Sequence, residues 1–310
     1  MAGLPSVKTL ILMAILALQT TGIWDHLSEA HRFKLSSAAA THSAPAEQVA
    51  IARPPLAPIP VQVGTSPLSL KSASVLAIDA STGTVLHAQD PGAQRPIASI
   101  SKLITCLVIL SRHSVDEIVT VPKLPEYIQG AELLGLVEGE KYRLGDLVTA
   151  ALVPSANDAA DTLAIYDSGS VSKFAAQMNL KMKQWAIKGT NFTSPSGLNE
   201  DNNYATALSL GKIAGLALTN PTIRDMVKLT NATISSQTGR VFNFTSTNKL
   251  LASGAFYGIK TGYTQIAGEC FVGLTRIDGH EVITVVLGAE NRFGASQELA
   301  NWIGSNWKWL

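Results

Sequence analysis

Residues 98–111 constrain the fold more than any other stretch, because they read as a helix that is apolar on nearly every face. A helix of this kind is buried rather than exposed, so other elements must surround it. Further helical patterns follow at residues 143–153, 157–166 and 169–186, and the last of them is amphipathic with polar residues on one side. The middle of the chain therefore predicts a helical subdomain.

Strand-like segments flank this helical region on both sides. Residues 74–89 read as a hairpin of two short apolar strands around a polar turn. Three more strands are predicted at residues 256–264, 269–277 and 281–289, and a helix follows them. Two strands, a helical insert, three strands and a final helix predict an α/β fold of the α+β kind, in which helices flank an antiparallel five-stranded sheet.

The N-terminal part of the chain has the pattern of an export signal. Lys8 precedes the apolar run of residues 9–18, and a basic residue before roughly 7–15 apolar residues marks a secretory signal. The run is short for a membrane span, which needs about 20 residues. We therefore expect a signal peptide or N-terminal membrane anchor at residues 1–24, a linker rich in Pro, Ala and Ser at 25–69, and the folded domain at 70–310.

Composition excludes some classes of function. Of the 310 residues, 46% are hydrophobic and 15% are charged, which allows a sizeable core. The net charge of +1 argues against nucleic acid as a partner, because phosphate-binding proteins carry a basic surplus. The two cysteines, Cys106 and Cys270, lie in apolar contexts, so they are either buried free thiols or a disulfide formed outside the cytosol. No Cys/His cluster or HExxH motif is present, and we expect no metal or other cofactor.

The motif Ser-x-x-Lys occurs twice, and its context separates the two copies. Ser99 and Lys102 lie one turn apart at the start of the buried helix, where unpaired backbone N–H groups give positive potential. That environment suits a nucleophile that must stabilise an oxyanion. Ser170 and Lys173 begin the amphipathic helix, where a serine is usually only an N-cap. We therefore select Ser99.

A serine hydroxyl needs a base, and Lys102 can serve only if its pKa falls. Burial in an apolar helix lowers the pKa of a lysine, and so does a neighbouring cation. Lys260 is a candidate for that cation. It begins the tripeptide Lys260-Thr261-Gly262 in a predicted edge strand. There Lys260 and Thr261 can hold a substrate carboxylate, and Gly262 permits close approach of the backbone.

A third element, Ser155-Ala156-Asn157, lies in a break between two predicted helices, after Pro154. A loop at such a break can bring a hydroxyl and an amide into a cleft. Taken alone, both side chains would most often cap a helix. The similar triplet of residues 246–248 stands in a polar stretch that reads as a connecting loop, and we discount it.

The order Ser-x-x-Lys, Ser-x-Asn, Lys-Thr-Gly resembles that of class A β-lactamases and penicillin-binding proteins. The surrounding segments sharpen the likeness to the D-alanyl-D-alanine carboxypeptidase family of low-molecular-mass penicillin-binding proteins. These segments are IDASTGTVL, PIASISKLIT, LVPSANDAADTLA, NFTSPSGL, GIKTGYT-x-x-AGEC and VVLGA, and they cover roughly residues 70 to 308. The resemblance implies the DD-peptidase-like transpeptidase fold and a periplasmic or cell-surface location.

The resemblance also implies a role for each matched position. The catalytic set is Ser99 as the acylated nucleophile, Lys102 as its general base and Ser155 as a proton relay. The substrate-binding set lines the cleft and comprises Asn157, Lys260, Thr261, Gly262, Tyr263 and Arg292. Within it, Lys260 and Thr261 would grip the terminal carboxylate. The backbone N–H groups of Ser99 and Tyr263 would form the oxyanion hole, and Arg292 stands near the place of a carboxylate-steering arginine in some members.

The implied reaction is hydrolysis of the D-Ala-D-Ala bond in peptidoglycan stem peptides, and β-lactams would acylate the same serine. No motif separates carboxypeptidase, DD-endopeptidase and transpeptidase outcomes. A class A-like β-lactamase is one alternative, but Glu200 follows the Leu-Asn pair that the lactamase glutamate precedes. A non-catalytic peptidoglycan-binding protein is another, although all the motif side chains are present. A Ser-His-Asp hydrolase lacks its G-x-S-x-G motif here.

Overall fold

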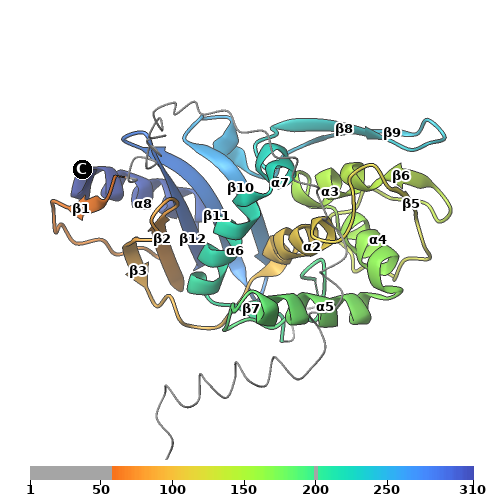
Figure 1. Ribbon diagram of the computed structural model, residues 1–310, viewed down its shortest axis with the longest axis horizontal. Coiled ribbons are helices and arrows are strands. Elements are labelled where there is room, and N and C mark those ends of the chain that lie inside the picture. Colours follow the sequence, from red (N-terminus) through yellow and green to blue (C-terminus); the bar gives the residue numbers. More distant parts are fainter. Residues whose placement is uncertain (1–57, 199–201) are drawn as a thin grey trace, which may run out of the picture. The chain divides into compact units, whose positions relative to one another are not determined.

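An antiparallel sheet organises the part of the chain that this computed structural model describes, residues 58–198 and 202–310 (Figure 1). Its strand order is β10-β11-β12-β2-β3. The strands are β2 (Ser74–Asp79), β3 (Val85–Gln89), β10 (Phe256–Thr264), β11 (Gly268–Ile277) and β12 (His280–Ala289). The N-terminal hairpin therefore pairs through β2 with the C-terminal strand β12. The predicted five-stranded antiparallel sheet is confirmed.

Both faces of the sheet are buried. On β2, Leu76 contributes to one core cluster, and its neighbours Val75 and Ala77 contribute to another, because successive side chains of a strand point to opposite faces. The first cluster includes residues of helices α2 (Ser101–Leu110) and α6 (Ala207–Thr219), and the second includes α8 (Arg292–Asn306). Figure 1 shows α6 and α8 on opposite sides of the sheet. Burial on both sides explains why the strands read as nearly continuous apolar runs.

The predicted buried helix is α2 (Ser101–Leu110), preceded by a short 3₁₀ turn, η1 (Ala98–Ile100). Nine of its ten residues are buried. The surrounding helices are α3 (Leu144–Leu152), α4 (Asn157–Ser168) and α5 (Val171–Gln184), with α6 between α2 and the sheet. Helix α7 (Pro221–Met226) follows α6 directly. The helical subdomain is confirmed, and its arrangement leaves the N-terminal end of α2 beside the edge strand β10.

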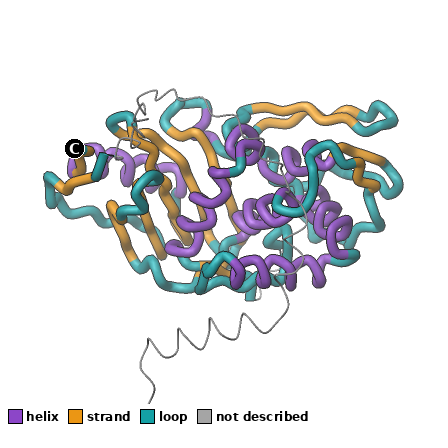
Figure 2. The backbone as a smooth tube through the Cα atoms, in the orientation of Figure 1, coloured by secondary structure: helices purple, strands orange, loops and turns teal. Residues whose placement is uncertain are grey.

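Several small elements were not predicted from the sequence pattern. Figure 2 shows them as short strands around the helices. They form the two-stranded pairs β4 (Arg95–Pro96) with β7 (Tyr204–Ala205), β5 (Ile118–Thr120) with β6 (Lys141–Arg143), and β8 (Asn231–Ser235) with β9 (Val241–Thr245), and a second 3₁₀ turn, η2 (Lys249–Leu251), precedes β10. Strands β4 to β7 have only two or three residues, too few for alternation to stand out. Strands β8 and β9 have five residues each and lie in the stretch before β10 that read as a polar connecting loop.

The two ends of the described chain meet, which corrects one predicted boundary. Strand β1 (Pro60–Gln62) pairs with β13 (Trp307–Trp309), and Ser66 donates from its backbone and hydroxyl to Asn306 Oδ1. The predicted linker extended to residue 69, whereas the chain joins the folded unit from Pro60 onwards. The predicted signal or anchor segment and residues 25–57 of the linker lie outside the described residues. No helix among the described residues is long and apolar enough to cross a bilayer.

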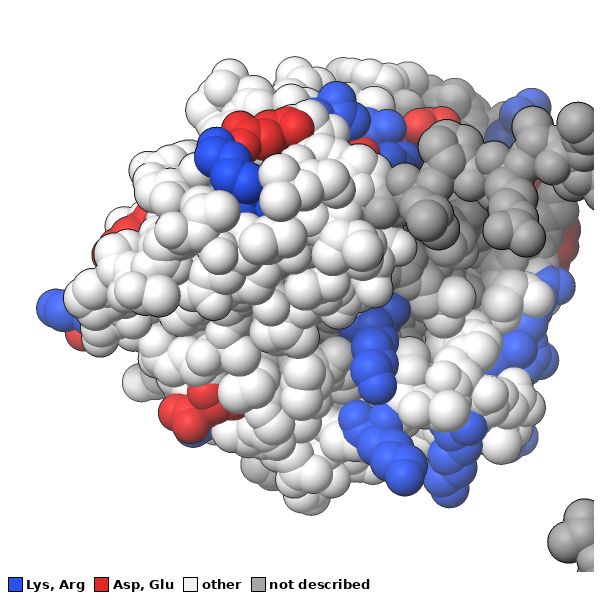
Figure 3. Space-filling model, turned by 60° about the vertical axis from the view of Figure 1, so that its left-hand side comes forward, with Lys and Arg blue, Asp and Glu red and all other residues white. Residues whose placement is uncertain are grey.

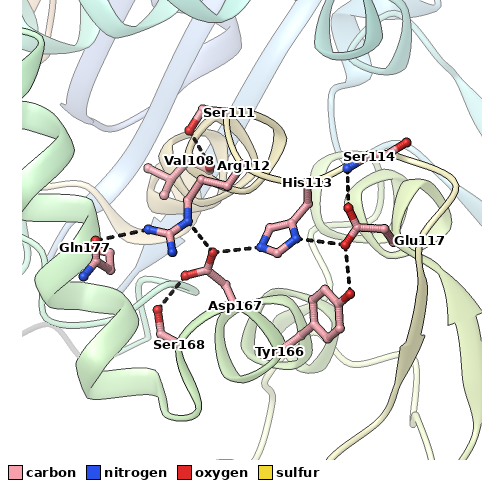
Figure 4. A network of polar contacts seen from close by, with 10 residues as sticks. All are labelled: Val108, Ser111, Arg112, His113, Ser114, Glu117, Tyr166, Asp167, Ser168 and Gln177. Atoms are coloured by element: carbon pink, nitrogen blue, oxygen red, sulfur yellow. Dashed lines mark hydrogen bonds and ion pairs between the residues drawn. The ribbon is translucent and has the colours of Figure 1, made fainter.

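A polar network fixes the far end of α2 to α4 (Figure 4). The Asp167 carboxylate, whose side chain is fully buried, accepts from Arg112 Nε at 2.8 Å and lies 2.9 Å from His113 Nε2. The other ring nitrogen of His113 lies 2.9 Å from Glu117 Oε2, and Tyr166 donates to the same oxygen. Because α2 and α4 carry the candidate catalytic residues at their other ends, this network holds the two helices in register.

Charged side chains are sparse on one face of the molecule. The face drawn in Figure 3 shows large uncharged areas between small groups of Lys and Arg and a few Asp and Glu.

The two cysteines are free thiols. Cys106 and Cys270 are both buried and form no disulfide, which decides between the two states expected from the sequence. Burial raises the pKa of Cys106 to about 12 and that of Cys270 to about 11, which makes both thiols chemically inert.

Candidate active site

Ser99 lies in η1, at the point where the chain turns sharply from β4 into α2. Ala98 makes the turn with a φ of +47°, and Ser99 is left partly exposed. Two glycines pack against this turn. A Cβ atom on Gly197 would lie 2.0 Å from the carbonyl oxygen of Ala98, and one on Gly262 would lie 2.8 Å from that of Ile97. Neither position has room for a side chain, so both glycines allow the backbone segments to enclose Ser99.

The Lys102 amine is buried directly behind Ser99. Its Nζ donates to Ser99 Oγ at 2.8 Å, to Asn157 Oδ1 at 2.6 Å and to the Ser196 carbonyl at 2.8 Å. Burial lowers the pKa of Lys102 from 10.5 to about 7, although the Asp161 carboxylate acts in the opposite direction. Near neutral pH a large fraction of the amine is therefore uncharged and has a lone pair that can accept the hydroxyl proton of Ser99.

A second buried lysine reaches the same loop from the sheet. Lys260 lies on β10, and its Nζ donates to Ser155 Oγ at 2.9 Å and to the Thr261 carbonyl at 3.1 Å. Burial lowers its pKa well below the usual value, and the charge of Lys102 lowers it further. The two amines thus lie close enough to repel. Burial is the larger cause for Lys260. Burial also lowers the pKa of Lys102, and the charge of Lys260 does not account for that shift, so the expectation that Lys260 is the cation which lowers the Lys102 pKa is not borne out.

The loop between α3 and α4 presents its side chains to both amines. Ser155 has a φ of +70°, a strained conformation for a residue with a side chain, and its hydroxyl accepts from Lys260. Asn157 begins α4, and its amide and backbone nitrogens donate to the Glu132 carbonyl at 2.9 and 2.8 Å. These bonds aim Asn157 Oδ1 at Lys102. The predicted loop therefore contacts both lysines, Lys260 through Ser155 and Lys102 through Asn157.

The opposite wall of the site is the edge strand β10. Thr261 Oγ1 lies 2.5 Å from Thr247 Oγ1, and Arg292 Nη1 donates to the Gly262 carbonyl at 2.9 Å. The backbone N–H of Arg292, at the start of α8, donates to Glu269. Tyr263 continues the strand with its side chain 62% exposed. Three hydrogen-bonding side chains, from Thr247, Thr261 and Arg292, thus face one end of the site.

These walls enclose a pocket of about 170 Å³. Most of the predicted site residues line it together: Ser99, Ser155, Asn157, Thr261, Gly262, Tyr263 and Arg292. Lys102 and Lys260 lie beneath this surface rather than on it, with exposures of 0% and 1%. A direct grip of Lys260 on a ligand carboxylate, as expected from the sequence, would therefore need the amine to leave its present partners.

Sequence reasoning missed three contributors. Thr247, which lies in the discounted triplet 246–248, lines the pocket beside Thr261. Glu132 and Ser196 act through their backbone carbonyls, which orient Asn157 and Lys102. The position of the triplet in the loop before β10 could have indicated Thr247, because a loop that leads into an edge strand lies near the end of that strand. The roles of the Glu132 and Ser196 carbonyls could not be predicted in this way, because every residue type carries a backbone carbonyl.

Comparison with known proteins places the chain in a family. The family model described as D-alanyl-D-alanine carboxypeptidase matches residues 61–291. The chain belongs to the D-alanyl-D-alanine carboxypeptidase family. It is 29% identical over 233 residues to the D-alanyl-D-alanine carboxypeptidase DacF of Bacillus subtilis, covering 73% of this chain and 59% of that protein. It is 32% identical over 249 residues to the D-alanyl-D-alanine endopeptidase of Escherichia coli, covering 76% and 77%.

Solved structures of two related proteins share the fold. The Streptomyces K15 DD-transpeptidase superposes with a TM-score of 0.72 at 29% identity, over 78% of this chain and all of that one. Penicillin-binding protein D2 from Listeria monocytogenes, solved in an ampicillin-bound form, gives a TM-score of 0.66 at 29% identity, over 78% and 100%. The family and the fold predicted from the motifs are both confirmed.

Proposed function

We propose that the protein is a serine-type D-Ala-D-Ala carboxypeptidase that acts on peptidoglycan stem peptides through an acyl-enzyme on Ser99. One observation carries the proposal: the Lys102 amine, buried and with a pKa of about 7, lies 2.8 Å from the Ser99 hydroxyl. A base that is partly neutral at physiological pH and within hydrogen-bonding distance meets both requirements of general-base catalysis. Membership of the family supports the substrate class.

In the first step, Lys102 accepts the hydroxyl proton while Ser99 Oγ attacks the carbonyl carbon between the two D-alanines. The backbone N–H groups of Ser99 and Tyr263 stabilise the oxyanion that forms. The carbon–nitrogen bond then breaks and the terminal D-alanine leaves as an amine. The proton that Lys102 has taken reaches that nitrogen through the Ser155 hydroxyl, which gives up its own proton and accepts one in exchange, so Lys102 is neutral again. Ser155 also accepts a hydrogen bond from Lys260. An ester between the remaining peptide and Ser99 results.

We assign the terminal carboxylate to the end of the pocket formed by Thr247, Thr261 and Arg292. Two hydroxyls and a guanidinium are donors that suit a carboxylate. Lys260 lies beneath them, where its role is to orient Ser155 and to supply positive potential rather than to grip the ligand directly. Asn157 binds the peptide backbone through its side-chain amide. To do so, the substrate replaces either Lys102 as the donor to Oδ1 or the Glu132 carbonyl as the acceptor from Nδ2.

In the second step, water attacks the ester, its hydroxyl group joins the acyl carbonyl carbon, and its proton returns to Ser99. Hydrolysis makes the enzyme a carboxypeptidase; an amine in place of water would make it a transpeptidase. β-Lactams acylate Ser99 in the same way. We place the reaction outside the cytoplasm, where peptidoglycan lies, and propose residues 1–24 as the signal or membrane anchor that takes the domain there.

A DD-endopeptidase is the second candidate, because a specific feature favours it. A hollow of about 580 Å³ adjoins the catalytic pocket and shares Gly130, Ala131, Leu198 and Tyr263 with it. A cross-linked substrate carries a second peptide that needs such space. The relatives named D-alanyl-D-alanine endopeptidase, from E. coli and Pseudomonas aeruginosa, are matched over 77% and 84% of their lengths.

The β-lactamase and binding-protein alternatives stay predictions. The residue on which the first depended, Glu200, lies outside the described residues. Rapid turnover of nitrocefin by the purified protein would favour the lactamase. Failure to release D-alanine from a muropeptide, together with failure to bind penicillin, would favour the binding protein.

The function is tested by intact mass after incubation with a fluorescent penicillin, by D-alanine release from a pentapeptide muropeptide, and by conversion of a cross-linked dimer into its two monomers. We expect one label on the wild type and on Ser170→Ala, and none on Ser99→Ala. Release from the pentapeptide identifies the carboxypeptidase, and cleavage of the dimer alone identifies the endopeptidase. Labelling of Ser99→Ala would contradict the assigned nucleophile.

A further inference from the structure

A separate hollow of about 260 Å³ lies next to the catalytic pocket and takes no part in the mechanism above. Its polar lining comes from Glu126, Tyr127, Asp161, Ser194 and Ser196. It adjoins the active site at two points: Leu198 lines both spaces, and the carbonyl of Ser196 accepts a hydrogen bond from Lys102. A group bound in this hollow, which we name the Asp161 pocket, would therefore lie beside a substrate held at Ser99.

One carboxylate oxygen of Asp161 is buried without a hydrogen-bond donor in the described part of the chain. It lies on α4, one turn beyond Asn157, and is only 4% exposed. Its Oδ2 accepts from the Tyr127 hydroxyl at 2.9 Å, whereas its Oδ1 is buried and has no partner among the residues described. Lys102 does not donate to it, because its three hydrogen bonds go to Ser99, Asn157 and Ser196. A buried carboxylate oxygen without a donor is unfavourable, and burial accordingly raises the pKa of Asp161 to about 6.

The lining of the pocket selects for a cation on an apolar stem. It presents two carboxylates, a phenol and two serine hydroxyls, and no Lys, Arg or His of the described chain lines it. Its other walls are apolar, formed by Pro125, Ile128, Val171 and Leu198. An aliphatic chain that ends in an ammonium group matches both features, because its methylenes pack on the apolar walls while its N–H groups reach the acceptors.

We propose that the Asp161 pocket binds the ammonium group of a basic side chain carried by the peptide substrate on the acyl side of the D-Ala-D-Ala bond. The proposal rests on the proposed function, and it adds a specificity: peptides with a free side-chain amine are preferred over the same peptides with that amine acylated. Acylation removes the charge and adds bulk, so an acylated side chain would leave Asp161 Oδ1 unpaired. A cross-linked or modified amine would be rejected in the same way.

The test compares D-alanine release from Nα-acetyl-L-lysyl-D-alanyl-D-alanine and from its Nα,Nε-diacetyl form. In the wild type we expect kcat/KM to favour the free amine by about tenfold or more, the range of a charge-assisted hydrogen bond. In Asp161→Asn, which keeps the shape and removes the charge, the ratio should fall to about one. Any effect of Asp161 on Lys102 changes both rates together and cancels in the ratio.

The controls separate this proposal from the function on which it rests. Asp225→Asn removes an exposed carboxylate elsewhere and should keep the wild-type ratio. Penicillin labelling of Ser99 with a ratio of one in the wild type would overturn the ammonium site and leave the proposed function intact. If neither peptide is cleaved, titration of Ser99→Ala protein with Nα-acetyl-L-lysine N-methylamide decides the matter. The proposal requires saturable binding that the added Asp161→Asn change abolishes, and absence of binding overturns it.

Discussion

The chain contains two helices that begin with Ser-x-x-Lys, and they differ in almost every respect except those letters. At α2, Ser99 sits in a 3₁₀ turn and the Lys102 amine is buried against it. At α5, Ser170 is an N-cap whose Oγ accepts from the backbone nitrogen of Lys173 at 3.2 Å, and Lys173 is exposed. The first pair is linked side chain to side chain, and the second is linked side chain to backbone.

The difference comes from distant parts of the chain. Asn157 and the Ser196 carbonyl supply the partners that hold the Lys102 amine, and the close approach of Gly197 and Gly262 encloses Ser99. Nothing comparable covers the start of α5, which faces solvent. A serine and a lysine one turn apart therefore do not by themselves make a catalytic pair. In the proposed mechanism, burial of the Lys102 amine is what allows it to act as the base for Ser99.

Replacing Lys102 or Lys173 should give the largest difference between the two pairs in the rate of Ser99 acylation. Lys102→Ala removes the base and should lower the rate of Ser99 acylation by penicillin about a thousandfold or more. Lys102→Arg should be equally inactive, because a guanidinium stays protonated. Lys173→Ala should leave the rate unchanged. Stopped-flow or quenched labelling measures these rates, and loss of acylation in Lys173→Ala would mean that the second pair takes part.

Matched glycine substitutions test the enclosure of Ser99 with the next largest effect. Gly197 and Gly169 both have positive φ values, +81° and +77°, so alanine strains either position by about 1–2 kcal/mol. At Gly197 the added Cβ would also meet the Ala98 carbonyl at 2.0 Å, whereas at Gly169 nothing lies within 4 Å. Displacement of Ser99 by about 1 Å should slow acylation about a hundredfold in Gly197→Ala.

Gly169→Ala, just before Ser170, is the control and should acylate at the wild-type rate. Chemical unfolding of both variants checks that they are folded, and the loss of stability should be larger in Gly197→Ala, where the clash adds to the backbone strain. Equal acylation rates in the two variants would mean that the turn at Ser99 tolerates displacement.

The pH dependence of acylation reports the buried amine directly. The neutral form of Lys102 is the reactive one and its pKa is about 7, so the rate should fall as pH drops below 7, to about a tenth of its plateau one unit lower. Because the Asp161 carboxylate raises the pKa of Lys102, Asp161→Asn should move this limb to lower pH. Lys173→Ala should keep the wild-type profile. A profile flat from pH 5 to 8, or a limb that moves upward in Asp161→Asn, would argue against Lys102 as the base.

The same contrast explains how much could be predicted from the sequence. The motif order and the apolar character of residues 98–111 were sufficient for Ser99 and Lys102, and the strand pattern was sufficient for the five-stranded sheet. The sequence did not predict contributions from the backbone or from residues whose position depends on the course of a loop. The Ser196 carbonyl is one, since every residue type carries a carbonyl, and the role of Thr247 depends on where the loop before β10 runs.

Long-range strand pairing accounts for the other differences. The helix predicted after the last strand ends at Asn306, and Trp307–Trp309 form β13 because β1 offers a partner from the opposite end of the domain. The same pairing draws Pro60–Gln62 out of a segment whose composition is that of a linker. Neither strand has a local pattern strong enough to indicate its partner, because three residues supply little alternation.

The smallest expected effect concerns the second motif alone. Ser170→Ala removes the oxygen that accepts from the Lys173 nitrogen, and loss of such an N-cap lowers the free energy of unfolding by about 1 kcal/mol. Ser99→Ala removes no cap, since η1 and α2 have no side-chain cap, and should cost less. Urea unfolding of both variants, beside their acylation rates, should therefore give opposite results: one serine contributes to stability and the other to chemistry. If Ser170→Ala is as stable as the wild type, the N-cap hydrogen bond of Ser170 does not contribute to stability.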